Sequence, residues 1–146
     1  MKKIFILICT LFIAVNVSAQ TRKVGDVIMI NGEFGVVFAV TTDGQHGKAV
    51  SVSTTKCNWN DAAKWCANYG RGWRLPTKDE LHVIYRNKAV INSALKINGY
   101  TMLEHEYWAS EIYNNGNNAW SVYMFNGNTC SLPKDFDIYV RAVTVF

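Results

Sequence analysis

The sequence predicts an α+β domain built around an antiparallel sheet. Strand-like segments separated by turn residues occupy the first and last thirds of the chain, whereas the middle third has helical periodicity. Strands, then helices, then strands are typical of α+β folds rather than of alternating βαβ units. Residues 20–146 have the length of one domain and contain no internal repeat or low-complexity segment.

Residues 1–19 are predicted to be a secretory signal peptide. Two lysines follow the first methionine, residues 4–15 are apolar, and small residues precede an expected cleavage after Ala19. The apolar run is too short to span a bilayer as a helix. We therefore expect an exported protein (periplasmic, cell-surface or secreted) with no stable membrane span after cleavage, folded over residues 20–146.

The charge balance argues against nucleic acid as a partner. The chain has 15 Lys and Arg against 11 Asp and Glu, and loss of the two N-terminal lysines leaves 13 against 11, a net charge of +2. No basic stripe accompanies this small charge. Aromatic residues make up 13% of the chain, enough to build a substantial core.

The first strands are expected at 27–30, 36–40 and 49–52. The segment "NGEFG" between the first two is typical of a hairpin, and "TTDGQHG" provides the next turn.

The middle third predicts two helices and a third short one. Trp59, Ala62, Ala63 and Cys66 recur at i, i+3, i+4 and i+7, which is one face of a helix that Gly70 ends. Thr77 and Glu80 form a capping box for the second helix, with a buried stripe at Leu81, Ile84 and Tyr85. Ile91, Ala94 and Leu95 indicate the third helix, closed near Asn98-Gly99.

The last third is predicted to return to strands at 107–110, 119–125 and 138–146. Alternation in the middle strand assigns its residues to two faces, with Trp120, Val122 and Met124 on one and Ser121, Tyr123 and Phe125 on the other.

Three cysteines remain after residue 19. A straight helix between Cys57 and Cys66 would separate them by about 13 Å, whereas a disulfide needs α-carbons within about 7 Å. These two are therefore not expected to bridge. Cys130 could pair with either, or all three could be free thiols.

The order of several motifs resembles a bacterial family of C-type-lectin-like fold. The motifs are "CANYGRGWRLPTKDEL", "YWASE", "NNAWSVYMFNGN" and "YVRAVTVF", preceded by "GDVIMINGEFGVVFAVTTDGQHGKAVSV". The family is typified by the C-terminal domain of the collagen-like adhesin Lcl and is related to the FISUMP major paralogous domain. The resemblance covers nearly all of residues 20–146.

This resemblance implies a twisted antiparallel sheet with two to three helices, a long loop region, and chain ends on adjacent strands. Domains of this broad fold bind glycans or proteins, and the typifying adhesin domain is associated with sulfated glycosaminoglycans. The resemblance implies no catalytic activity and no cofactor, so we expect a non-enzymatic domain.

The chain departs from better-known relatives of this fold in two respects. Ala142 stands where many of them have a cysteine that bridges to the first helix, so Cys66 lacks that partner. The Glu-Pro-Asn and Gln-Pro-Asp triplets of calcium-dependent lectins are absent, and "WND" at 59–61 opens the first helix instead of lying on a late strand.

Residues that could bind an acidic ligand, act as a nucleophile or hold a metal ion are expected to have structural roles instead. Arg74 is expected to pair or pack beside the second helix. Cys66 lies on an apolar helical face, where a thiol packs as a small hydrophobe. His46, His82 and His105 are scattered, so we expect no metal site.

The asparagine-rich segment between Tyr107 and Asn128 is the candidate for function. Some of its asparagines are explained as turn residues around Gly116 and Gly127. Tyrosine combined with asparagine, serine and glycine is also the composition of adaptable recognition loops. We therefore predict glycan or protein binding, in the manner of an adhesin, by Glu111, Tyr113, Asn114, Asn115, Asn117, Asn118, Ser121, Tyr123, Asn126 and Asn128.

The alternative is a structural or assembly subunit of a surface complex that packs through the same face. Exposure of Phe125 and Phe146 beside Tyr123 would favour that alternative, because large apolar patches mark protein interfaces.

Overall fold

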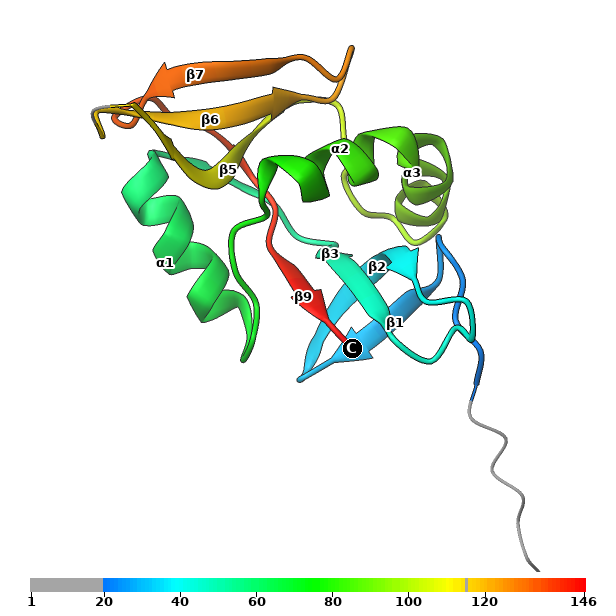
Figure 1. Ribbon diagram of the computed structural model, residues 1–146. Coiled ribbons are helices and arrows are strands. Elements are labelled where there is room, and N and C mark those ends of the chain that lie inside the picture. Colours follow the sequence, from blue (N-terminus) through cyan, green and yellow to red (C-terminus); the bar gives the residue numbers. More distant parts are fainter. Residues whose placement is uncertain (1–19, 115) are drawn as a thin grey trace, which may run out of the picture.

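The computed structural model describes residues 20–114 and 116–146, which form two β-sheets and three helices (Figure 1). The α+β prediction is confirmed, although the strands divide between two sheets instead of one. The four-stranded sheet has the order β1 (Val27–Ile30), β2 (Glu33–Val40), β3 (Gly47–Ser51), β9 (Val143–Val145). The five-stranded sheet has the order β4 (Thr55–Cys57), β8 (Ile138–Val140), β5 (Glu106–Tyr113), β6 (Asn118–Tyr123), β7 (Thr129–Pro133). The predicted signal peptide lies outside the described residues.

The strand prediction was wrong at the C-terminus. Residues 138–146 form two strands, because the chain leaves the five-stranded sheet after Val140 and enters the four-stranded sheet at Val143. The expected adjacency of the chain ends is also wrong, since β2 and β3 separate β1 from β9. One pairing, Tyr107 with Tyr139 between β5 and β8, is parallel.

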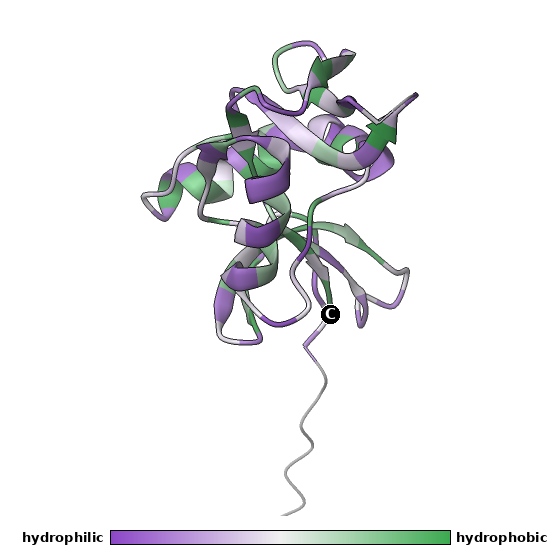
Figure 2. Ribbon diagram, turned by 90° about the vertical axis from the view of Figure 1, so that its left-hand side faces the viewer, coloured by the Kyte–Doolittle hydropathy of each residue, from purple (hydrophilic) through white to green (hydrophobic). Residues whose placement is uncertain are grey.

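The three helices follow the predicted periodicity: α1 (Trp59–Tyr69), α2 (Lys78–Arg86) and α3 (Lys88–Ile97). The Thr77 hydroxyl accepts the Glu80 N–H while the Glu80 carboxylate accepts the Thr77 N–H, so the predicted capping box is present. In Figure 2, where α1 faces the viewer, hydrophilic and apolar residues alternate along that helix, as expected for a helix that covers a sheet.

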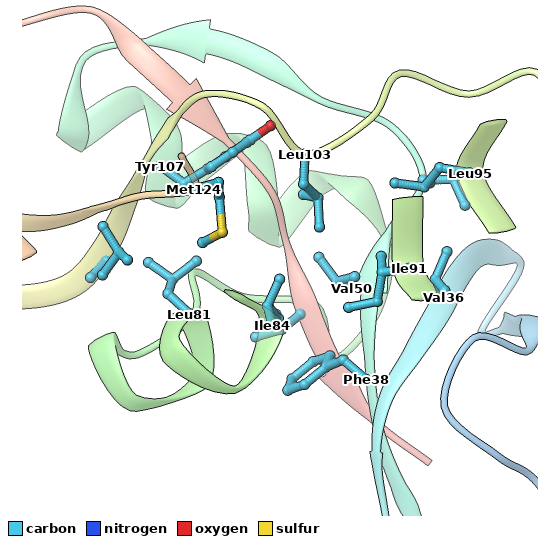
Figure 3. Packing of buried hydrophobic residues seen from close by; sticks show 14 residues of the cluster. Val36, Phe38, Val50, Leu81, Ile84, Ile91, Leu95, Leu103, Tyr107 and Met124 are labelled. Atoms are coloured by element: carbon cyan, nitrogen blue, oxygen red, sulfur yellow. The ribbon is translucent and has the colours of Figure 1, made fainter. Parts of the chain in front are cut away.

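Two apolar clusters hold the layers together. The larger one joins α2 and α3 to β2, β3, β5 and β6, and Figure 3 shows Leu81, Ile84 and Ile91 converging on Phe38 and Val50. The second cluster lies beneath α1 and contains Ala62, Cys66, Trp73, Trp108 and Ala142. Helices therefore cover both faces of the five-stranded sheet near its centre, which limits the surface left for ligands.

Arg141 links the two sheets at the point where the chain crosses between them. Only 1% of its surface is exposed. Its Nη1 donates to the carbonyl oxygens of Ser51 (2.9 Å) and Val52 (2.6 Å), and its Nη2 donates to the carbonyl of Thr101. No carboxylate pairs with this guanidinium among the described residues. Backbone carbonyls therefore solvate a buried charge, and burial lowers the pKa of Arg141.

Glu80 joins α2 to the segment before it and to β3. Its carboxylate forms a bidentate pair with Arg74 (2.8 and 2.7 Å) and a third bond with Lys48 (2.8 Å), so the structural interpretation of Arg74 is confirmed. Burial alone would raise the pKa of Glu80, but hydrogen bonds from Arg74 and Lys48 outweigh it and lower the pKa from 4.5 to about 2.

Acid is expected to destabilise the domain through Glu80. A carboxyl group whose pKa is depressed on folding stabilises the fold above its unfolded value of 4.5, and that contribution disappears as the pH falls to about 2. We expect Glu80 to contribute roughly 1–3 kcal/mol in this window, since Arg74 and Lys48 are half exposed and solvent weakens the pairing. The measurement is urea unfolding from pH 7 to pH 2 for the wild type and Glu80→Gln. The difference in unfolding free energy should shrink towards pH 2, and a constant difference would contradict the assignment.

Candidate functional site

The turn of the β5–β6 hairpin, residues 113–118, carries five of the ten predicted contact residues. Tyr113 and Asn118 are the last register partners before the turn. Asn114 (φ 45°) and Gly116 (φ 89°) adopt left-handed backbone conformations, which asparagine and glycine tolerate. Asn114 and Asn117 are exposed, so the described part of this loop faces water as predicted. Asn115 lies outside the described residues.

A groove of about 570 Å³ opens beside this hairpin. Three separate parts of the chain supply its walls: the start of α1, the turn of the hairpin, and the segment after β7. The lining residues are Asn58, Asn60, Gly116, Asn117, Asn118, Pro133, Lys134 and Asp135.

The backbone of Lys134 fixes the geometry of the groove. Its N–H donates to the Asn117 carbonyl (3.1 Å), and its carbonyl accepts the N–H of Trp59 (3.0 Å). One residue therefore bonds the hairpin on one side and the first residue of α1 on the other. The ammonium of Lys134 lies 4.5 Å from the centre of the Trp59 ring, in cation–π geometry.

The asparagines of the groove differ in availability. Asn58 is the N-cap of α1, and its amide is engaged on both sides, accepting the N–H of Asp61 (3.0 Å) and donating to the Asp61 carboxylate (2.8 Å). Asn60, two residues further along in the first turn of α1, is exposed. Asn118, the first residue of β6, is half-buried. Asn60 and Asn118 are therefore better placed than Asn58 to meet a ligand.

An aromatic cluster lies at the same end of the hairpin, where Tyr113 is the register partner of Asn118; we call it the Trp120 cluster and define it as Tyr113, Trp120 and Lys78. The Tyr113 and Trp120 rings meet edge to face at 4.7 Å, and the Lys78 ammonium lies 4.2 Å from the Trp120 ring centre. Both rings are partly exposed. The cluster thus combines aromatic surface with one cation.

Glu111, which was predicted to contact a ligand, instead supports this cluster. Its carboxylate oxygens accept the backbone N–H of Lys78 at 3.0 and 3.1 Å. Lys78 is the first residue of α2, where a negative charge is favourable to the helix. The side chain of Glu111 therefore holds α2 against β5.

Ser121 is not available to a ligand. The residue has no exposed surface, and its hydroxyl donates to the Glu106 carboxylate (2.6 Å) and the Cys130 carbonyl (3.3 Å). It lies opposite the buried Trp108 in the strand register, on a face of the sheet that the second apolar cluster covers. We therefore withdraw Ser121 from the candidate contacts.

The remaining predicted residues lie at the far end of β6. Tyr123 is 40% exposed and Phe125 is 76% exposed, with ring centres 6.1 Å apart. The side-chain amide oxygen (Oδ1) of Asn126 accepts the backbone N–H of Asn128 (3.0 Å), so Asn126 acts as a turn residue. Asn118 and Tyr123 are the first and last residues of the six-residue strand β6, so five steps of about 3.4 Å, roughly 17 Å, separate this end from the groove. The predicted set is thus divided between two ends of one strand.

The sequence interpretation missed Asn58, Asn60, Lys134 and Asp135. The "WND" motif drew attention to Asn60, but only as the start of a helix. Lys134 is 75 residues from Trp59, and nothing in the sequence signals that contact. These residues enter the site because the fold brings them to the hairpin.

The cysteines and histidines have structural environments. Cys57, Cys66 and Cys130 are free thiols, and burial raises the pKa of Cys66 to about 12. His82 shares a hydrogen bond with the Thr129 hydroxyl (2.9 Å), and His105 stacks on Tyr139 at 3.8 Å. Within residues 20–114 and 116–146, no three His, Cys, Asp or Glu side chains gather in a way that could hold a metal ion.

Comparison with known proteins gives one clear match. The family model described as the Lcl C-terminal domain matches residues 35–144, which is most of the chain and includes both the hairpin and the groove. No curated protein matches the sequence closely enough to count as a relative. In the part of the chain that the structure describes, no helix is long and apolar enough to cross a membrane.

Proposed function

Because the chain belongs to the Lcl C-terminal domain family, we propose that it is a non-catalytic recognition domain that binds a glycan or a protein outside the cytoplasm. Membership of this family suggests a domain of a surface-associated protein. The predicted signal peptide supports export, and the C-type-lectin-like architecture expected for this family supports recognition.

The observation that carries the proposal is the groove beside the exposed hairpin. Asn114 and Asn117 face water, the groove opens next to them, and the Trp120 cluster adds aromatic surface at the same end of the hairpin. Amides can exchange hydrogen bonds with many polar partners, and partly exposed aromatic rings offer rigid contact area. The contacts we propose are Tyr113, Asn114, Asn117 and Asn118, together with Asn60 and Trp120.

A glycan array combined with size-exclusion chromatography tests this function. We expect the purified protein to be monomeric and to bind array members, and Tyr113→Ala with Asn117→Ala to weaken that binding without changing the elution volume. Individual sites of this kind are weak, so the protein should be displayed in several copies on the detection bead. A silent array together with a discrete dimer would reject glycan recognition and favour the assembly alternative.

The assembly alternative rests on the far end of β6. Tyr123 and Phe125 form an exposed aromatic pair there, which is one of the features expected of an interface. Phe146, the other expected member, lies against Gly47 at the four-stranded sheet instead. If this surface makes a dimer, Phe125→Ser should convert it to a monomer.

A further inference from the structure

The charge distribution around the groove restricts the class of ligand it can take. Among the described residues that line the groove, Lys134 and Asp135 are the only ones with ionisable side chains, and they are adjacent and opposite in sign. The Lys134 ammonium is also occupied by the Trp59 ring. Binding of a sulfated or carboxylated chain depends on several Arg or Lys side chains acting together, and this groove offers one.

The apolar content of the groove is equally small. Pro133 has the only apolar side chain in the lining as far as the structure describes it, and Gly116 contributes backbone. Docking of peptide side chains requires hydrophobic pockets or aromatic anchors at the centre of a contact. The groove walls do not provide such anchors.

Most of the other residues that line the groove are asparagines, whose side chains end in amides. Each asparagine amide has a carbonyl oxygen that accepts hydrogen bonds and an NH₂ group that donates two. Sugar hydroxyls likewise donate and accept hydrogen bonds, so an asparagine amide can bond to a sugar hydroxyl either as donor or as acceptor. A volume of about 570 Å³ falls within the roughly 300–1,000 Å³ typical of small-ligand sites.

We infer that the groove between the start of α1 and the β5–β6 hairpin binds a neutral, hydroxyl-rich saccharide, with Asn60 and Asn118 as its principal contacts. This inference rests on the proposed recognition function and adds the ligand class and the contribution of α1. Asn60 lines the groove from the start of α1 and Asn118 lines it from the start of β6, so a bound sugar unit would meet amides from two different elements. The Lys134 peptide keeps those two elements at a fixed separation.

The test is titration of the purified protein with a panel of uncharged hexose and N-acetylhexosamine oligosaccharides and with their sulfated counterparts. We expect the uncharged members to bind, with affinity changing less than about twofold between roughly 50 and 500 mM NaCl, because no ion pair is formed. Asn60→Ala and Asn118→Ala should each weaken binding about three- to tenfold, the effect of one lost hydrogen bond.

Asn68→Ala is the matched control, because Asn68 is an exposed asparagine near the other end of α1. It should bind like the wild type. Equal unfolding midpoints in urea for the Asn60 and Asn68 variants show that any difference in affinity comes from the groove.

Three results would overturn the inference. Binding restricted to sulfated sugars, falling steeply with salt, would reject the neutral class but leave recognition standing. Neutral sugars bound equally well by the Asn60 and Asn118 variants but lost in Tyr123→Ala would move the site to the other end of β6. Absence of binding to every sugar of both classes would reject the inference, and a stable dimer in the same sample would reject the proposed recognition function as well.

Discussion

Replacement of Arg141 by methionine is expected to lower the free energy of unfolding by about 2–4 kcal/mol. The carbonyls of the buried residues Ser51 and Val52 lose their donors, and an unsatisfied buried group costs about 1–3 kcal/mol. Removal of an unpaired buried charge offsets part of this loss, since burial of the guanidinium is itself unfavourable. Urea unfolding monitored by circular dichroism measures the net change in the free energy of unfolding.

Arg71→Met is the control for this experiment. Arg71 is exposed, so its replacement should change stability by no more than about 0.5 kcal/mol. Arg141→Lys should recover part of the loss, because an ammonium donates to fewer carbonyls than a guanidinium fork. If Arg141→Met were as stable as Arg71→Met, the guanidinium would not be what joins the two sheets.

Trp108→Ala is expected to cost about 3–5 kcal/mol, the usual range for a large aromatic removed from a core. Trp108 has no exposed surface, and its indole N–H donates to the Cys57 carbonyl (3.1 Å), so the change leaves both a cavity and an unpaired acceptor. Trp120→Ala should cost only about 1–2 kcal/mol, because part of that ring already meets solvent.

The two tryptophan variants also separate stability from recognition. Measured at a temperature where both are folded, Trp108→Ala should bind ligand normally, whereas Trp120→Ala should lose affinity. Equal losses of stability in the two variants would show that Trp120 is a core residue and has no special place at the hairpin.

The helices could be predicted because their signals are local. The capping box of Thr77 and Glu80 marks the start of α2, and the spacing of Leu81 and Ile84 defines the buried face of the helix. The short strands β4 and β7 carry no comparable alternation, and they form because longer neighbours in the sheet pair with them. The apolar run 138–146 looked like one strand because pattern alone does not show that Arg141 is buried at a crossing.

The candidate site was predictable only in part, for a similar reason. The composition of the 113–118 segment indicates a polar recognition loop without knowledge of its neighbours. Alternation placed Ser121 on the face opposite Trp120, but it does not reveal that helices cover both faces of the sheet there. Asn60 and Lys134 join the site through contacts between residues far apart in the chain, which only the folded structure supplies.

The position of Lys134 over Trp59 makes the groove observable without a label. A molecule that displaces the ammonium changes the polarity around one indole, while Trp73 and Trp108 stay shielded in the interior. Intrinsic fluorescence of the unmodified protein should therefore shift as the groove fills, and Trp59→Phe should remove the contribution of this indole to the shift while leaving the occupant bound.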